Sequence, residues 1–254
     1  MQHNILVLSS FFSRTGTGLS RAMRMINDMG HLPRPVISAI NTSVDPGSNR
    51  KDLFYIPTDV VMAQIERALE SWPVEAIKVG FIGAAETQTK ISERLAKLKK
   101  DRNVPIVLNP CLLNDEGDNQ ATLDEVNALK RDLFLISDVV TPSVAEAEAL
   151  TGMKIQDLGD MQQAADMLLT LGPRAVLLRG GDFQEDSVID LLATDTAQLT
   201  FNAPRLLRSN VSGRSGFGGV VACAIAVGLA KGQNFEVCVE NALTQIKKMY
   251  LSEL

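Results

Sequence analysis

The sequence predicts an α/β fold with a largely parallel sheet covered by helices on both faces. Short apolar runs rich in β-branched residues alternate with longer amphipathic segments, which is the pattern of repeated βαβ units. Parallel sheets of this kind are buried on both faces, so a three-layer α/β/α sandwich is expected. The 254 residues contain no internal repeat, low-complexity stretch or evident linker, which predicts one domain over residues 1–254.

The expected elements alternate in order along the chain. The expected strands are residues 5–8, 36–40, 76–82, 105–108, 135–140, 175–178, 188–192 and 197–201. The expected helices are residues 18–29, 58–69, 87–98, 122–132, 144–151, 161–171, 219–230 and 235–251. Thr58 is a candidate N-cap, and the last two strands are expected to pair as a hairpin. The long loop 41–55 is either a flap over a site or a plain surface excursion.

The charge and composition exclude several classes of protein. A net charge of −5 and a pI of about 5.2 argue against a nucleic-acid partner, because phosphate backbones attract clustered Lys and Arg. The sparse cysteines Cys111, Cys223 and Cys238 have no CxxC spacing, so neither a disulfide framework nor a zinc site is expected. The start of the chain turns polar too soon for a signal peptide. No apolar run reaches the ~18 residues of a membrane span, and we expect a cytoplasmic protein.

Candidate sites lie where the expected strands end, because open α/β sheets bind ligands at the carboxyl ends of their strands. Residues 9–18 carry glycines before a helix, and residues 108–111 end a strand in Asn-Pro-Cys. Residues 178–182 read Leu-Arg-Gly-Gly-Asp. This places an arginine guanidinium, which can bind phosphate through two N–H groups, next to glycines whose backbone a ligand can approach closely. Each of these segments is open to two interpretations, a ligand contact or an ordinary turn.

The glycine-rich segment 212–219 gives the strongest local signal. It reads Ser-Gly-Arg-Ser-Gly-Phe-Gly-Gly and leads into an apolar helix. Unpaired N–H groups and the positive end of a helix make such a loop an anion site. It is not a P-loop, since no Gly-Lys-Ser/Thr follows. The histidines, His3 and His31, fit no catalytic triad.

Together these segments resemble the hydroxymethylpyrimidine phosphate kinases, a vitamin-kinase branch of the ribokinase superfamily that includes the pyridoxal kinases. The resemblance runs in order across nearly the whole chain. Its motifs are PTDVVMAQI at residues 57–65, KVGFIG at 78–83, LNP at 108–110, TPSVAEAEALTG at 141–152, LRGGD at 178–182 and APR at 203–205.

The resemblance implies a ribokinase-like sandwich and an ATP- and Mg²⁺-dependent kinase acting on a hydroxymethyl group of a pyrimidine or pyridine precursor of thiamine or vitamin B6. It also implies a homodimer. The nucleotide and phosphate site would comprise Arg179, Gly180, Gly213, Gly216, Gly218 and Gly219. The substrate pocket would comprise Ser10, Phe12, Ser43, Gly80, Asn109 and Cys111. Glu146 would help to hold magnesium through water.

The sequence departs from this family where the chemistry is expected. The catalytic Cys or Asp falls on Gly219, or on Gly216 in a second alignment, so the catalytic side chain is absent in both. Phe12, Ser43 and Asn109 replace a pocket aspartate, a substrate-reading glutamine and a phosphate-side aspartate. Two hypotheses follow: a kinase with weak or altered activity, or a pseudokinase that binds a vitamin precursor or nucleotide. Loss of a general base costs roughly 10²–10⁴-fold in rate.

Overall fold

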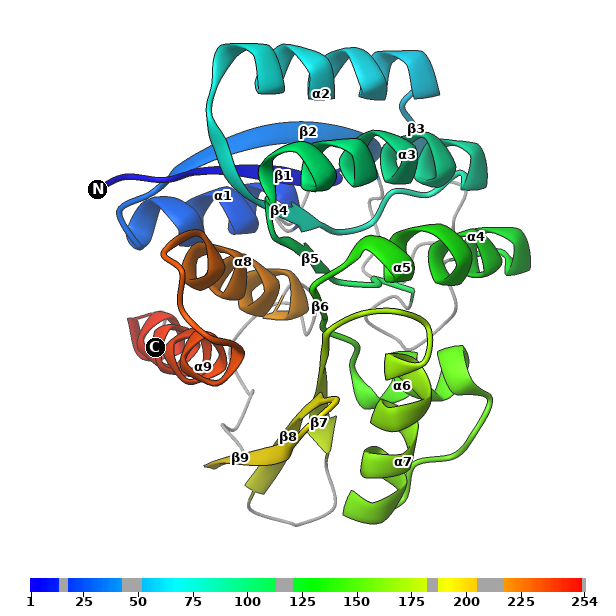
Figure 1. Ribbon diagram of the computed structural model, residues 1–254, viewed down its shortest axis with the longest axis vertical. Helices are drawn as coiled ribbons and strands as arrows, with labels where there is room; N and C mark the ends of the chain where they lie inside the picture. The colour runs from blue at the N-terminus through cyan, green and yellow to red at the C-terminus, as the bar shows by residue number, and fades with distance from the viewer. Residues whose placement is uncertain (14–17, 43–51, 113–120, 182–186, 205–216, 253–254) are drawn as a thin grey trace.

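The computed structural model describes residues 1–13, 18–42, 52–112, 121–181, 187–204 and 217–252. These residues form one nine-stranded sheet in the order β3-β2-β1-β4-β5-β6-β7-β8-β9, with helices against both faces (Figure 1). The three-layer α/β/α sandwich is therefore confirmed. The strands are β1 (Asn4–Phe12), β2 (Leu32–Asn41), β3 (Leu53–Tyr55), β4 (Val74–Val79), β5 (Ile106–Leu108), β6 (Val139–Val140), β7 (Ala175–Gly181), β8 (Ser187–Thr194) and β9 (Gln198–Pro204).

The helices divide between the two faces of the sheet. One face is covered by α1 (Leu19–Asp28), α8 (Phe217–Ala230) and α9 (Phe235–Ser252). The opposite face carries α2 (Thr58–Ser71), α3 (Ala85–Arg102), α4 (Leu123–Ala128), the π-helical turn η2 (Leu129–Leu133), α5 (Phe134–Ile136), α6 (Val144–Thr151) and α7 (Leu158–Leu169). In the described part of the chain, no helix is long and apolar enough to span a membrane.

The sheet is parallel in its centre and antiparallel at its ends. Strands β2, β1, β4, β5, β6 and β7 pair in parallel. The hairpin β8–β9 extends the sheet beyond β7 in antiparallel pairing, as expected from the sequence. At the other edge, β3 pairs antiparallel with β2. The sheet is thus largely parallel, and the carboxyl ends of its central strands meet at one edge.

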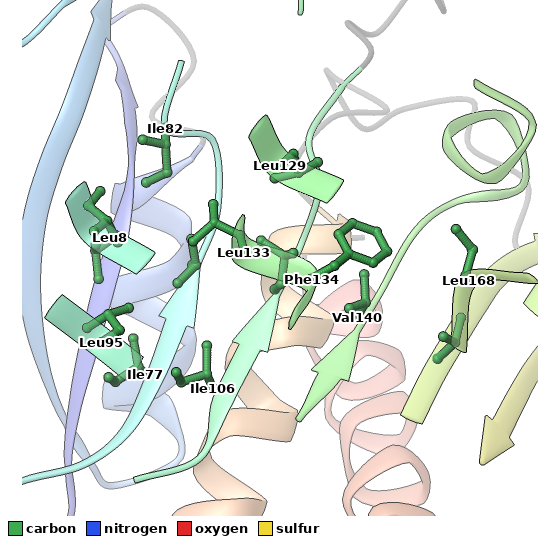
Figure 2. Close-up of a cluster of buried hydrophobic side chains, with 14 of the residues drawn as sticks. Leu8, Ile77, Ile82, Leu95, Ile106, Leu129, Leu133, Phe134, Val140 and Leu168 are labelled. Carbon is green, nitrogen blue, oxygen red and sulfur yellow. The ribbon is translucent and has the colours of Figure 1, made fainter. Parts of the chain in front are cut away.

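Alternation along each strand produces two separate hydrophobic cores. In β1, Leu6 and Leu8 face the helices α2 to α7, whereas Ile5 and Val7 face α1 and α8. Figure 2 shows the first core, where residues of β1, β4 and β5 meet Leu95 and Phe134. Helix α8 is buried along residues 220–227, because it lies between the sheet and α9.

Several expected elements differ from those observed. Residues 135–140 were expected as one strand, but Phe134–Ile136 is helical and β6 comprises Val139–Val140 alone. A short apolar run does not distinguish a buried helix from a buried strand. Thr58 is not an N-cap: it is the first residue of α2, and its Oγ1 lies 2.8 Å from Thr87 Oγ1. The short edge strand β3 falls inside the expected loop 41–55.

Candidate functional site

A row of polar side chains crosses the sheet at the carboxyl ends of its central strands. On the face covered by α8, each of these strands presents apolar residues such as Ala76, Val107 and Val139. Two residues further along, the same face of each strand becomes polar, since side chains alternate with period two. This polar row comprises Ser9 of β1, Lys78 of β4, Asn109 after β5, Thr141 after β6 and Arg179 of β7.

Hydrogen bonds connect one half of the row. The Nε of Arg179 donates to the Thr141 carbonyl oxygen at 3.2 Å. The Thr141 hydroxyl donates to Asn109 Oδ1 at 3.3 Å, and Asn109 Nδ2 donates to the sulfur of Cys111. Asn109 and Thr141 are buried. The chain of bonds from Arg179 to Cys111 therefore fixes these side chains in one arrangement.

The first turn of α8 lies directly against this row, and glycine makes the approach possible. A Cβ atom on Gly218 would stand 2.7 Å from Asn109 Oδ1 and would also collide with the guanidinium of Arg179. On Gly219, a Cβ atom would meet Lys78 Nζ at 3.7 Å, an ordinary van der Waals distance. Position 218 therefore favours glycine, since any side chain there would displace Asn109 and Arg179, whereas position 219 has room for a side chain that would face Lys78.

Gly80 makes room for Lys78 within the row. Parallel pairing places Gly80 level with Ser9 and Asn109, because its neighbour Val79 pairs with both Leu8 and Leu108. A Cβ atom on Gly80 would collide with the Lys78 ammonium and stand 2.7 Å from Ser9 Oγ. The ammonium group of Lys78 thus occupies the space above Gly80.

Lys78 is a site residue that the sequence reasoning did not select. Its side chain is 1% exposed. Among the described residues, it donates no hydrogen bond and forms no ion pair. The available signal was a lysine inside the otherwise apolar run Ala76-Ile77-Lys78-Val79, because buried lysines are rare unless paired.

Gly80 and Cys111 of the expected substrate pocket line one small pocket. Phe81, Pro110 and Leu112 complete this side of it. Cys111 adopts a left-handed backbone conformation, with φ of 51°. Desolvation raises the pKa of its thiol, and the Lys78 ammonium opposes that shift. Such a thiol is largely protonated and hydrogen-bonded rather than nucleophilic.

Ser10 and Phe12 lie elsewhere, at the end of β1. Ser10 is buried and Phe12 is half-buried. The Phe12 ring and the Ser10 carbonyl pack against Gly18, whose φ is 66°. Neither residue lines the pocket of Gly80 and Cys111. Ser43, Gly213 and Gly216 lie outside the described residues.

Glu146 and Gly180 already have protein partners. Glu146 accepts hydrogen bonds from the N–H of Leu112 and the N–H of Ser143, both at 2.9 Å. Ser143 is the N-cap of α6, so Glu146 completes a capping box there. The N–H of Gly180 donates to Asp190 Oδ1 at 2.7 Å. A metal role for Glu146 and a phosphate role for Gly180 stay predictions.

The arrangement favours an anionic ligand. Lys78 and Arg179 bring two cations to the start of α8, where the helix dipole adds further positive potential. In the described part of the chain, no three His, Cys, Asp or Glu side chains gather as a metal cluster. Fold and site together define an open α/β protein with a positively charged site at the carboxyl edge of its sheet.

The chain belongs to the phosphomethylpyrimidine kinase family, whose model matches residues 13–253. A hydroxymethylpyrimidine/phosphomethylpyrimidine kinase of Streptomyces coelicolor is 29% identical over 238 residues, covering 94% of this chain and 85% of that protein. The thiamine biosynthesis bifunctional protein ThiED of Geobacter sulfurreducens is 30% identical over 239 residues. That match covers 94% of this chain and 47% of the bifunctional protein, so the chain corresponds to about half of it.

Solved structures share the fold. A phosphomethylpyrimidine kinase of Clostridium difficile superposes with a TM-score of 0.80 at 23% identity, covering 99% of each chain. The pyridoxal kinase of Staphylococcus aureus, in complex with AMP-PCP and pyridoxal, superposes with a TM-score of 0.81 at 24% identity, covering 95% of this chain and 85% of that one. The resemblance to vitamin kinases noted in the sequence is therefore confirmed.

Proposed function

We propose that this protein phosphorylates the hydroxymethyl group of a pyrimidine or pyridine vitamin precursor, with ATP as the phosphoryl donor. The curated relatives described above are kinases of hydroxymethylpyrimidine and its phosphate or a thiamine biosynthesis protein. The S. aureus structure contains an ATP analogue together with pyridoxal. The observation that carries the proposal is the close approach of Gly218 to Arg179 and Asn109.

Phosphoryl transfer requires positioning and charge stabilisation more than covalent chemistry from the protein. Arg179 presents a guanidinium fork beside the N–H groups of the first turn of α8, and both bind phosphate oxygens well. The Thr141 carbonyl accepts the Nε–H of Arg179, and Asn109 accepts the Thr141 hydroxyl beside Gly218 of α8. These contacts orient the guanidinium toward the start of the helix. The vitamin ring would lie over the carboxyl ends of β1 and β4, beside Gly80 and next to the phosphate site.

Magnesium would neutralise charge on the transferring phosphates. The described oxygen atoms of Asn109 and Glu146 suit Mg²⁺, which prefers oxygen ligands and keeps several waters. Both Glu146 oxygens accept protein N–H groups, so this carboxylate would reach the ion through water and not directly.

The missing catalytic side chain sets the expected rate. Gly219 has no group that can accept a proton from the substrate hydroxyl, and loss of a general base lowers rates by roughly 10²–10⁴-fold. We therefore propose a slow kinase. The alternative of a pseudokinase has no support from the comparisons, because the relatives and structures named above are described as kinases or as a thiamine biosynthesis protein.

The experiment is Mg²⁺-dependent ADP release in the presence of hydroxymethylpyrimidine, its phosphate or pyridoxal. The wild type is compared with Gly219→Cys, which restores a family-type side chain where there is room for one. Slow release by the wild type and faster release by Gly219→Cys are expected. Arg179→Met should abolish release, whereas Arg174→Met, at an arginine whose side chain is 69% exposed, should not. Absence of release by both wild type and Gly219→Cys across the panel contradicts the proposal.

We further propose, from the family resemblance, that residues 1–254 form one domain that acts as a cytoplasmic homodimer. Size-exclusion chromatography with light scattering should give about twice the 27.5 kDa chain mass. A monomer at micromolar concentration contradicts the dimer.

A further inference from the structure

Lys78 stands in an environment that disfavours an isolated cation. Its side chain is 1% exposed, and among the described residues neither an ion pair nor a hydrogen bond compensates the charge. The burial of an unpaired ammonium group costs about several kcal/mol of folding free energy. Charged groups held in unfavourable surroundings are concentrated at binding and catalytic sites.

The ammonium group of Lys78 is aimed at the start of α8. It lies above Gly80 and beside Ser9, and it is 3.7 Å from where a Cβ atom on Gly219 would stand. It is near enough to Cys111 and Cys223 to lower the pKa of both thiols against the larger effect of burial. Lys78 therefore faces the gap between β4, Cys111 and the first turn of α8.

The surroundings of this gap carry positive potential. The N-terminus of α8 and the Arg179 guanidinium both lie there. The described carboxylate that acts on the Cys111 thiol is Glu146, which opposes its ionisation and whose oxygens accept the N–H groups of Leu112 and Ser143. Burial raises the pKa of the Asp190 carboxyl and the Arg179 guanidinium opposes that shift, so Arg179 has one carboxylate within reach. Among the described residues Lys78 forms no ion pair, and an anion is the partner that it would share with the start of α8.

We propose that Lys78 binds an anionic oxygen of a phosphate group between β4 and the start of α8, at the place vacated by the side chain missing from Gly219. The inference rests on the proposed function and adds to it a specific residue that contacts the phosphoryl group. Lysine serves here as a compact charge with three donors. Stabilisation of charge on a transferring phosphoryl is the chief electrostatic task of such a site, and Lys78 performs it where a base is absent.

The first experiment measures binding of inorganic phosphate in the absence of nucleotide, by calorimetry and by thermal shift. It compares wild type, Lys78→Met and the control Lys90→Met, at a lysine of α3 whose side chain is 53% exposed. Lys78→Met should weaken phosphate binding at least about tenfold, the low end for a hydrogen bond to a charged group. Lys90→Met should bind as the wild type does. Unchanged phosphate affinity in Lys78→Met overturns the inference.

The same variant distinguishes an anion-binding lysine from a structural one. Without ligand, Lys78→Met should melt at the wild-type temperature or above it, because an unpaired buried charge has been replaced by an apolar side chain. With phosphate, the wild type should gain stability that Lys78→Met does not gain. A lower melting temperature together with unchanged phosphate binding identifies a structural lysine and overturns the inference.

A second variant places the missing anion in the protein itself. Gly219→Asp puts a carboxylate beside Lys78, since position 219 has room for a side chain. We expect Gly219→Asp to raise the ligand-free melting temperature and to lower phosphate affinity at least about tenfold. Both effects should vanish when Lys78→Met is added. Wild-type phosphate affinity in Gly219→Asp overturns the inference even if Lys78→Met fails to fold.

These measurements separate the two proposals. Phosphate binding that depends on Lys78 without ADP release on any tested vitamin precursor supports the anion site and contradicts the kinase proposal. ADP release that Lys78→Met leaves unchanged supports the kinase and overturns the role of Lys78.

Discussion

Glu146 joins α6 to the segment after β5, because its Oε1 accepts the N–H of Leu112 at 2.9 Å. The same carboxylate accepts the N–H of Ser143 at the start of α6. Asn109 and Cys111 stand immediately before Leu112, so this single side chain holds one wall of the candidate site in place.

Glu146→Ala should therefore destabilise the fold. The change leaves two backbone N–H groups without their acceptor, for which we expect a loss of about 2–4 kcal/mol in the free energy of unfolding. Urea denaturation measures it. Asp157→Ala, which removes the cap of α7, is the control and should cost about 1 kcal/mol. If Glu146 acts chiefly as a magnesium residue, Glu146→Ala would instead raise the Mg²⁺ requirement and leave stability unchanged.

Gly218 and Gly219 should respond oppositely to alanine. In Gly218→Ala the new methyl group meets Asn109 and Arg179, and such overpacking lowers the free energy of unfolding by about 1–3 kcal/mol. In Gly219→Ala the new methyl group lies at an ordinary van der Waals distance, 3.7 Å, from Lys78 Nζ, and better helix propensity should raise that free energy by up to about 1 kcal/mol. Equal effects of the two substitutions in thermal unfolding would contradict the close approach of α8 to the row.

Acid should weaken the amino edge of the sheet near the histidines. Desolvation lowers the pKa of His31, as do the charges of His3, Lys231 and the N-terminal amine, while Glu75 opposes the shift. A lowered pKa means that the folded state binds the proton less well, so stability is full above pH 6.5 and falls as the pH falls through the folded pKa. Melting temperatures from pH 8 to pH 5 should show this loss, and His31→Asn should reduce it.

The native cysteines should resist alkylation at neutral pH. Burial raises the pKa values of Cys223 and Cys238 to about 11, and only the thiolate reacts rapidly. In Gly219→Cys, the introduced thiol would lie beside the Lys78 ammonium and should react faster than the native three with iodoacetamide at pH 7.5. Mass spectrometry of the labelled peptides measures each rate. Rapid labelling of Cys223 in the folded protein would contradict its burial.

Much of the fold was predictable because apolar residues recur with different spacings in strands and in helices. Helix Val144–Thr151 and the hairpin β8–β9 agree with expectation. The errors occurred where the local sequence pattern is ambiguous. The apolar run 135–140 begins as the end of a helix and finishes as a strand. Thr58 has the residue type of an N-cap, but its hydroxyl contacts Thr87 of α3.

The site was predicted less completely, for a geometric reason. Gly80, Asn109, Arg179 and Gly218 were selected and lie together, because strand ends in a parallel sheet meet at one edge. Lys78 was missed since its importance arises from burial and from the absence of a side chain on Gly80. The sequence places Lys78 two positions before Gly80, but this spacing alone does not show that Lys78 is buried or that its ammonium group fills the space above Gly80. The partners of Glu146 and Gly180 likewise lie on distant segments.

On each central strand, the residue of the polar row stands two positions after the last apolar residue that faces α8. Substitutions within the row should therefore leave intact the apolar packing of the sheet against residues 220–227 of α8, which lie beyond the first turn that meets the row. During evolution, substitutions can therefore change the reactive side chains of the polar row without changing the selection that acts on the hydrophobic cores. Gly219 would be an example of that independence if the family's catalytic position falls there: it has no side chain, yet the sheet, the helix and the buried Lys78 are all in place.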